Sequence, residues 1–255
     1  MSRRPTFRRR LRRTSVMSDT AVSIALAAGI VAAWIAIHFG AIFAWRWQWD
    51  TAPVAVLLIA AQTWLSVGLF ILAHDCMHGS LAPGHDRFQR ALGTFALGAY
   101  AALSYRAMLP AHHRHHAAPG SAQDPDFHVG NPHALLPWFV AFFRRYYTHG
   151  QIVRITLVAL LYMAFGVSLV NIVAFWAVPA VLALVQLFVF GTWLPHRHGA
   201  DGFADHHNAR SLRGGGRGAM LRSLLACFHF GGYHHEHHLS PGTPWWRLPR
   251  VTRRR

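Results

Sequence analysis

The chain has 255 residues, of which 53% are hydrophobic and only 13% are charged, and its formal net charge is +16. This charged fraction is about half of the roughly 25% usual for soluble domains. A strongly basic chain can bind nucleic acid, but no nucleic-acid motif or stacking module accompanies the charge here. We therefore expect an integral membrane protein that contacts lipid and binds no nucleic acid.

The first elements in chain order are a basic arm and two apolar segments. Seven of the first thirteen residues are Arg, and the arm extends over residues 1–18. Apolar segments follow at 20–45 and 53–73, and each reaches the roughly 20 residues that cross about 30 Å of hydrocarbon. A cleaved secretory signal is not indicated, because 20–45 is too long. An Arg-rich transit peptide remains an alternative interpretation of the arm.

Two less regular apolar stretches lie in the middle of the chain. Residues 91–109 are rich in Gly and Ala, and residues 134–147 mix aromatic side chains with Arg144 and Arg145. The second pattern is typical of a helix that lies in the membrane interface. The first could span, but a span there would separate histidine clusters that we expect to share metal ions. We therefore predict that 91–109 is interfacial or re-entrant.

Two further apolar segments, 152–171 and 173–195, complete four predicted spans. Arg residues at both ends of the chain mark the cytoplasmic side by the positive-inside rule. We predict an all-α integral membrane protein with four transmembrane helices as two hairpins, interfacial helices and a cytoplasmic His-rich cap. A single domain would cover 19–250, followed by a basic tail, 251–255. Buried helices of a large soluble core are the alternative interpretation.

Three histidine clusters carry the chemistry. Residues three and four apart share one face of a helix, so the histidines in each cluster can point at one place. Eight imidazoles exceed the four ligands of one tetrahedral zinc and suit two metal ions. Iron, copper, nickel and zinc all accept such ligands. Interfacial histidines without metal, or a metal or proton transporter, remain alternatives, although a transporter requires ionisable groups within its spans. The eight residues are His74, His78, His112, His115, His116, His234, His237 and His238.

Several acidic residues lie in or beside these clusters. Metal-bound imidazoles usually donate their other N–H group to a carboxylate or carbonyl, and we predict that role for these acids. Helix capping or loop solvation is the alternative, most clearly for the pair that flanks a proline. The residues are Asp75, Asp124, Asp126, Asp205 and Glu236.

The order and spacing of the clusters around four spans resemble the membrane fatty-acid desaturase and hydroxylase superfamily. Shorter strings resemble its bacterial-type β-carotene ketolases more closely, over roughly residues 55–250. They lie at 73–79, 124–127, 190–196, 207–211, 228–238 and 244–249. One departure is Cys76, where that family more often has a small residue such as Ala.

The resemblance implies a non-haem di-iron oxygenase. We expect it in a bacterial inner (plasma) membrane, and the charge bias predicts that its termini and active site lie on the cytoplasmic side. It would use two iron ions, O2 and an external donor such as reduced ferredoxin. Two hydroxylations at C4 or C4′ of a β-ionone ring, followed by loss of water, would convert β-carotene into echinenone and canthaxanthin. Aromatic residues near the clusters could line the carotenoid tunnel: Phe95, Tyr100, Tyr105, Trp193, Phe230 and Tyr233.

A ninth ligand is expected at His196, which ends the last predicted span at the depth of the other clusters. Related desaturases have a comparable histidine at this place. Hydrogen bonding to a carbonyl, to Asp201 or to Asp205 is the alternative role. Three other functions stay open: a fatty-acid desaturase or hydroxylase, a carotenoid 3-hydroxylase, and a metal or proton transporter.

Overall fold

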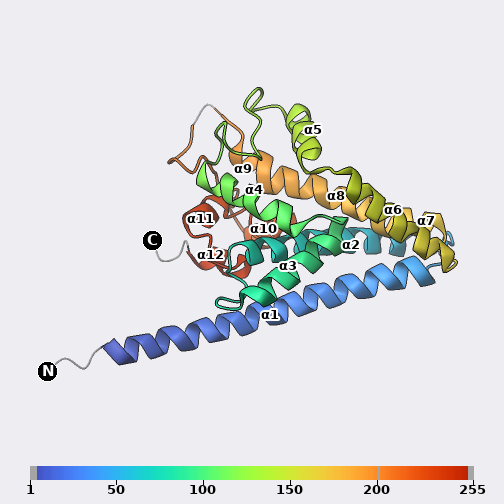
Figure 1. The fold of residues 1–255 in the computed structure, drawn as a ribbon, viewed down its shortest axis with the longest axis horizontal. Helices are drawn as coiled ribbons and strands as arrows, with labels where there is room; N and C mark the ends of the chain where they lie inside the picture. Colours follow the sequence, from blue (N-terminus) through green and yellow to red (C-terminus); the bar gives the residue numbers. More distant parts are fainter. Residues whose placement is uncertain (1–4, 200–201, 252–255) are drawn as a thin grey trace.

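The computed structural model describes residues 5–199 and 202–251, and side chains from Asp19 onward. The side chains of the predicted basic arm and residues 252–255 of the predicted tail therefore lie outside the described part. Every regular element within the described ranges is a helix (Figure 1). These are α1 (Pro5–Ala44), α2 (Ala52–Met77), α3 (Asp86–Ala101), α4 (Tyr105–Ala117), α5 (Leu135–Tyr146), α6 (His149–Ala164), α7 (Leu169–Ile172), η1 (Val173–Ala177), α8 (Val178–Leu187), η2 (Phe188–Trp193), α9 (Leu194–His196), α10 (Ala219–Cys227), α11 (His234–Leu239), η3 (Trp245–Arg247) and α12 (Leu248–Val251).

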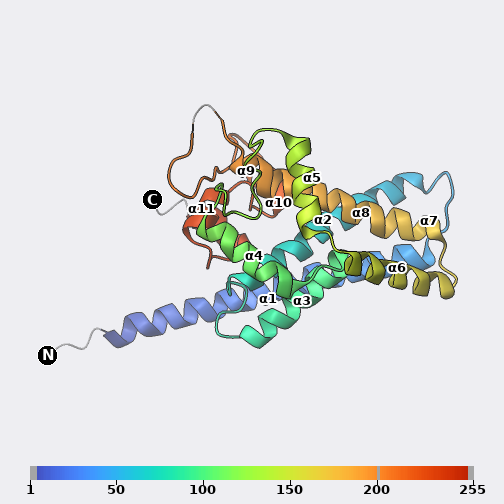
Figure 2. The ribbon, with the colours of Figure 1, turned by 45° about the horizontal axis from the view of Figure 1, so that its top comes forward.

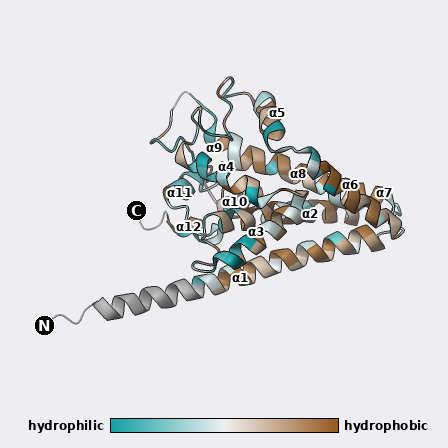
Figure 3. Ribbon diagram, in the orientation of Figure 1, coloured by the Kyte–Doolittle hydropathy of each residue, from teal (hydrophilic) through white to brown (hydrophobic). Residues whose placement is uncertain are grey.

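Two antiparallel helical pairs form the apolar part of the molecule. Helix α1 is followed by α2, and α6 is followed by the continuous helical stretch Leu169–His196, which comprises α7, η1, α8, η2 and α9. The turn within each pair, between α1 and α2 and between α6 and α7, lies at one end of the molecule. Helices α4, α9 and α11 gather at the other end in both views (Figures 1 and 2). Hydropathy follows this division, with apolar residues concentrated toward the turns (Figure 3).

Three helices of the described residues are long and apolar enough to cross a membrane: Asp19–Ala44, Ala52–Met77 and Leu169–His196. The expectation of four spans is therefore confirmed only in part. Helix α6 has 16 residues, or roughly 24 Å at 1.5 Å per residue, which is shorter than the hydrocarbon core.

The boundaries predicted for the second pair were also wrong. Apolar residues continue to 171, but α6 ends at Ala164 because Gly166 adopts a left-handed φ of 83°. The next helix then begins at Leu169 rather than 173. Its N-cap is Ser168, whose hydroxyl accepts a hydrogen bond from the Asn171 amide at 3.2 Å. Hydropathy does not reveal a turn within an apolar run. The N-cap residue Ser168 and the glycine Gly166 are the sequence signals that indicate it.

The stretch 91–109 is divided between α3 and α4. Helix α3 ends where Ala102 adopts a left-handed φ of 52°, and α4 starts with Ser104 as its N-cap, which accepts a hydrogen bond from the Ala107 amide. Neither helix is among the membrane-crossing candidates of the described residues. Residues 134–147 form α5 as expected. The interfacial position of both stretches stays a prediction.

Helix α2 is the centre of the packing and carries the first two histidines. It packs against α1, α3 and α8, and its residues Val67, Leu69 and Ala73 are completely buried. The indole of Trp34 on α1 donates a hydrogen bond to Ser66 at 3.1 Å. This packing holds the polar end of α2 against α4.

Asn171 holds the two helical pairs together at the opposite end. Its side-chain amide donates to the carbonyls of Ile42 and Trp45 at 3.1 and 3.0 Å, and it accepts a hydrogen bond from the Trp47 indole at 2.7 Å. Buried amides need such partners. The aromatic turn after α1 is thereby fixed against the start of α7.

Candidate metal centre

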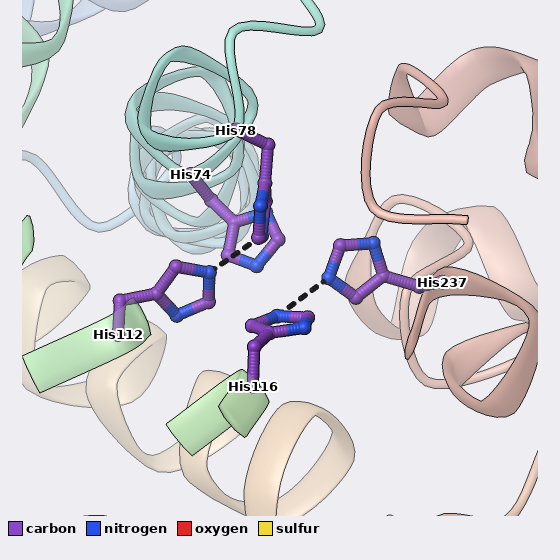
Figure 4. A group of neighbouring side chains, drawn as sticks. All are labelled: His74, His78, His112, His116 and His237. Atoms are coloured by element: carbon purple, nitrogen blue, oxygen red, sulfur yellow. Dashed lines mark hydrogen bonds between the residues drawn. The ribbon is translucent and has the colours of Figure 1, made fainter. Parts of the chain in front are cut away.

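Five histidines from three helices converge on one point (Figure 4). One ring nitrogen of each lies within 4.8 Å of one nitrogen of every other. The Nε2 atoms of His78 and His112 are 2.7 Å apart, and those of His116 and His237 are 3.1 Å apart. The first group comprises His74 and His78 from the end of α2, His112 and His116 from α4, and His237 from α11.

A second group of four buried histidines lies directly beside the first. It joins His115 of α4, His196 of α9, and His234 and His238 of α11, again within 4.8 Å of one another. The rings of His116 and His238, one from each group, stack with centroids 4.4 Å apart. All eight cluster histidines and His196 therefore come together at one site, divided five and four.

Helical periodicity explains this division. On α4, His112 and His116 are one turn apart and serve the first group, while His115 faces the second. His234 and His238 are likewise one turn apart on α11. The adjacent His113 leaves this face, and its Nε2 lies 3.1 Å from the Met77 carbonyl.

The last ligand candidate stands on an irregular helix end. Pro195 lacks the N–H group that would continue the α-helical ladder, and the preceding turn, η2, is a π-helix. Single π turns occur frequently at functional sites. The irregular turn ends with His196 almost fully buried, at 1% exposure.

The environment keeps most of these imidazoles neutral. Burial, reinforced by the neighbouring imidazoles, holds the pKa of His112, His237 and His238 well below its ordinary value. Neutral imidazole is the form that binds metals. Nitrogen atoms about 3 Å apart can share a proton in pairs, but five around one point cannot all do so. The buried, nitrogen-only donor set therefore fits transition-metal ions.

Asp124 orients one of the nine histidines. Both of its carboxylate oxygens lie 3.0 Å from His115 Nδ1, and it also accepts hydrogen bonds from the amides of Gly120 and Asp126. Burial alone would lower the pKa of His115, but the hydrogen bond and charge of Asp124 raise it. Donation from Nδ1–H leaves the Nε2 lone pair of His115 directed into the second group.

Asp126 lies at the edge of this contact. Its Oδ2 is 4.0 Å from His115 Nδ1, and its Oδ1 accepts a short hydrogen bond from the Tyr146 hydroxyl. Burial raises the pKa of Asp126. The carboxylate is thus shared between the histidine groups and α5.

The other three predicted acids make their hydrogen bonds to partners other than the nine histidine side chains. Asp75 accepts a hydrogen bond from the Trp245 amide at 3.1 Å. Glu236 pairs with Ser211 and Arg213, and Asp205 contacts two histidines outside the groups. On a helix, the residue adjacent to a ligand points away from it, which explains Asp75 and Glu236. These contacts tie loops to α2 and α11, and a role of the three acids in orienting metal ligands stays a prediction.

An apolar cavity of about 330 Å3 lies between the helices and reaches both histidine groups. Its walls come from α2, α3, α4, α5, α6 and α8, and its polar end contains His74, His112, His115, His116 and His234. Two predicted aromatic residues, Tyr100 and Phe230, line it. The ring of Phe230 lies 4.3 Å from that of His74.

Four predicted tunnel residues lie elsewhere. Phe95 is 43% exposed on the outside of α3, and Tyr105 packs against Gly93. Trp193 donates a hydrogen bond to the His133 carbonyl, and the hydroxyl of Tyr233 donates to Met220. Proximity in sequence to a histidine cluster does not determine which side of a helix faces the cavity.

Several cavity residues were missed by sequence reasoning. They lie on α5, α6 and α8, far from the clusters in sequence, and only the aromatic content of 134–147 gave a signal. These are Phe142, Phe143, Tyr146, Ile152, Ile155, Ala180, Val181 and Leu184.

The helices and histidine groups correspond to a known class. A family model described as fatty acid desaturase matches residues 47–155 and 133–255. The chain is 47% identical over 233 residues to a beta-carotene ketolase from Paracoccus sp. (strain N81106 / MBIC 01143), covering 90% of this chain and 92% of that protein. It is 33% identical to beta-carotene 4-ketolase 3 from Haematococcus lacustris, with 92% and 80% covered. A zeaxanthin 4-ketolase from Chlamydomonas reinhardtii is 32% identical, with 89% and 52% covered.

The chain therefore belongs to the fatty acid desaturase family and, within it, to the beta-carotene ketolases. This confirms the resemblance carried by the sequence motifs.

Proposed function

We propose that this protein is an O2-dependent di-iron ketolase that oxidises C4 and C4′ of the β-ionone rings of β-carotene. The observation that carries the proposal is the apolar cavity that ends at both histidine groups. A hydrocarbon ring admitted there would reach members of both histidine groups without crossing water. The names of the relatives support β-carotene as the substrate.

The cavity volume supports an end-on mode of binding. About 330 Å3 is near the lower limit of the roughly 300–1,000 Å3 typical of small-molecule sites. The cavity would hold one ring end, while the rest of the carotenoid remains in the bilayer or along the exposed apolar helices. The second ring would be oxidised after the molecule is released and turned round.

The nine histidines would hold two iron ions, five ligands on one side and four on the other. Bound iron supplies the activation of O2, and the protein supplies orientation and exclusion of competing reactions. Phe230 and Tyr100 would position the ring by contact with its faces. Asp124 would keep His115 in the tautomer that offers Nε2. Two successive hydroxylations at one carbon give a geminal diol, which loses water to form the ketone.

Electrons would come from an acidic one-electron donor such as reduced ferredoxin. The Arg residues of both termini, together with the positive-inside rule, support cytoplasmic termini and a cytoplasmic histidine cap in a bacterial inner membrane. Four crossings would require α6 to span a locally thinned bilayer or to be extended by its flanking residues.

Expression in a bacterial host that accumulates β-carotene tests the activity. We expect echinenone and canthaxanthin, identified by mass and by a red-shifted absorption. An inactive His116→Ala variant is the matched control, because it leaves the spans intact. If only 3-hydroxy carotenoids or unsaturated fatty acids accumulate, the ketolase proposal is wrong, although a di-iron centre could still be present. Metal analysis of the purified protein tests the centre directly, with two iron ions expected per chain.

A further inference from the structure

A second set of ligand-type side chains lies outside the nine histidines. Asp205 and His207 of the loop before α10 meet His235 of α11, with one ligand atom of each within 4.8 Å of the others. His207 Nδ1 is 3.0 Å from Asp205 Oδ1, and His235 Nε2 is 2.8 Å from Asp205 Oδ2. None of the three belongs to either histidine group.

The backbone holds these residues in place. The His207 amide donates to Asp205 Oδ1 at 2.9 Å, and the Asn208 side chain anchors the loop by donating to the Pro119 carbonyl at 2.9 Å. On the other side, the His235 amide donates to the Ser211 hydroxyl at 3.1 Å. The loop that carries Asp205 and His207 and the helix that carries His235 are therefore each held by other hydrogen bonds. Of the three ligand atoms, only Asp205 Oδ1 takes part in one of them.

The donor set and its exposure are those of an open metal site. Two imidazoles and one carboxylate, with a fourth position free for water, form a common three-ligand zinc set. The side chains of Asp205, His207 and His235 are 32%, 18% and 21% exposed, so water reaches the fourth position. The ring centroid of His238, one of the nine histidines, lies 6.3 Å from that of His207.

We propose that Asp205, His207 and His235 form a third metal site, separate from the nine-histidine centre, which takes a divalent ion such as Zn2+. The ion links the loop that follows α9 to α11, the helix that carries His234, His237 and His238. Its occupancy therefore stabilises the scaffold of the nine-histidine centre without donating a ligand to it. The competing explanation is a carboxylate that bridges two histidines by hydrogen bonds alone.

Isosteric variants separate these explanations. In His235→Gln the side-chain amide nitrogen takes the place of Nε2, and in His207→Asn it takes the place of Nδ1. Both variants can still donate a hydrogen bond to Asp205, but a carboxamide nitrogen does not ligate a divalent metal. His85→Ala, at an exposed position before α3, is the matched control for the loss of a surface histidine.

The experiment is Co2+ titration of the full-length, iron-loaded protein in detergent, with metal content and visible absorption as readouts. We expect one Co2+ per chain beyond the iron, with tetrahedral-type bands and a raised Tm, in the wild type and His85→Ala. Both isosteric variants should lose that one equivalent, the bands and the Tm shift while retaining their iron. Equal Co2+ binding by wild type and isosteric variants, or none in the wild type, would overturn the proposal. If the nine-histidine centre fails to hold iron, Co2+ enters it in every variant, and the difference of one equivalent still decides the question.

Discussion

The Nε2 atoms of His196 and His234 lie 2.8 Å apart, although 38 residues separate the two histidines. His196 Nδ1 is 2.8 Å from the Asn208 carbonyl. A carbonyl only accepts, so Nδ1 carries the proton and the Nε2 lone pair of His196 points into the second histidine group. The alternative role expected for His196, a hydrogen bond to a carbonyl, is thus met by Nδ1, while Nε2 stays directed at the other histidines of the second group. Asp201, the other alternative partner, lies outside the described residues.

The first prediction is that His196→Ala lowers iron content and activity. Removal of one of four candidate ligands leaves the second group with three. Loss of an outer partner of a metal ligand already costs about 10–100-fold, so loss of a ligand should reduce ketolase activity at least that far. Iron per chain, measured on purified protein, is the primary readout.

His198→Ala is the control for this prediction. His198 is exposed, and its ring packs on Phe127 rather than on either histidine group. We expect iron content and activity close to wild type. Equal iron in His196→Ala and wild type would remove His196 from the ligand set.

A second prediction concerns Asp124, which accepts three hydrogen bonds and orients His115. Asp124→Asn keeps the shape but replaces one acceptor oxygen with a donor and removes the charge. We expect iron affinity to fall roughly 10–100-fold, measured by competition with a chelator. Asp75→Asn, whose carboxylate contacts the Trp245 amide instead, should change iron affinity much less. A comparable loss in both variants would indicate general destabilisation rather than loss of ligand orientation.

The sequence predicted the centre better than its surroundings. Spacings of three and four residues define a helix face whatever the tertiary fold, so the convergence of the eight cluster histidines followed from local periodicity. The end of α6 could not be predicted in this way, because the turn at Gly166 lies within an apolar run. The cavity walls on α5, α6 and α8 and the partners of Asp205 depend on packing between segments distant in sequence, which hydropathy and spacing do not encode.

A third prediction tests the cavity by filling it. Leu184 lines the cavity on α8, and its neighbour Val185 does not. Leu184→Trp should obstruct the ring, because even one extra methylene in a hydrophobic pocket costs roughly 1–3 kcal/mol of transition-state binding, or about 10- to 200-fold in kcat/KM. Iron content should not change, because Leu184 belongs to neither group of candidate ligands.

Val185→Trp provides the comparison for the cavity variant. Its side chain is 40% exposed on the outer surface of the helix, where added bulk faces lipid. Activity near the wild-type level is expected. The cavity assignment fails if both tryptophan variants retain activity or if Val185→Trp is the more impaired.

The last prediction places the histidine cap and the aromatic turn on opposite sides of the membrane. Gln48 is exposed in the turn between α1 and α2, and Ala122 is exposed in the loop that follows α4. Cys76 and Cys227 are both buried and are replaced by Ala to remove background labelling. In cells, an impermeant thiol reagent should label Gln48→Cys but reach Ala122→Cys only after permeabilisation. The reason is that α1 and α2 form an antiparallel pair whose turn lies at the end opposite α4 (Figure 1), and the basic termini favour the cytoplasm for the other end.

Labelling of Ala122→Cys in intact cells, with Gln48→Cys protected until permeabilisation, would invert the proposed orientation. Labelling of both positions from outside would instead contradict the crossing of the membrane by α2.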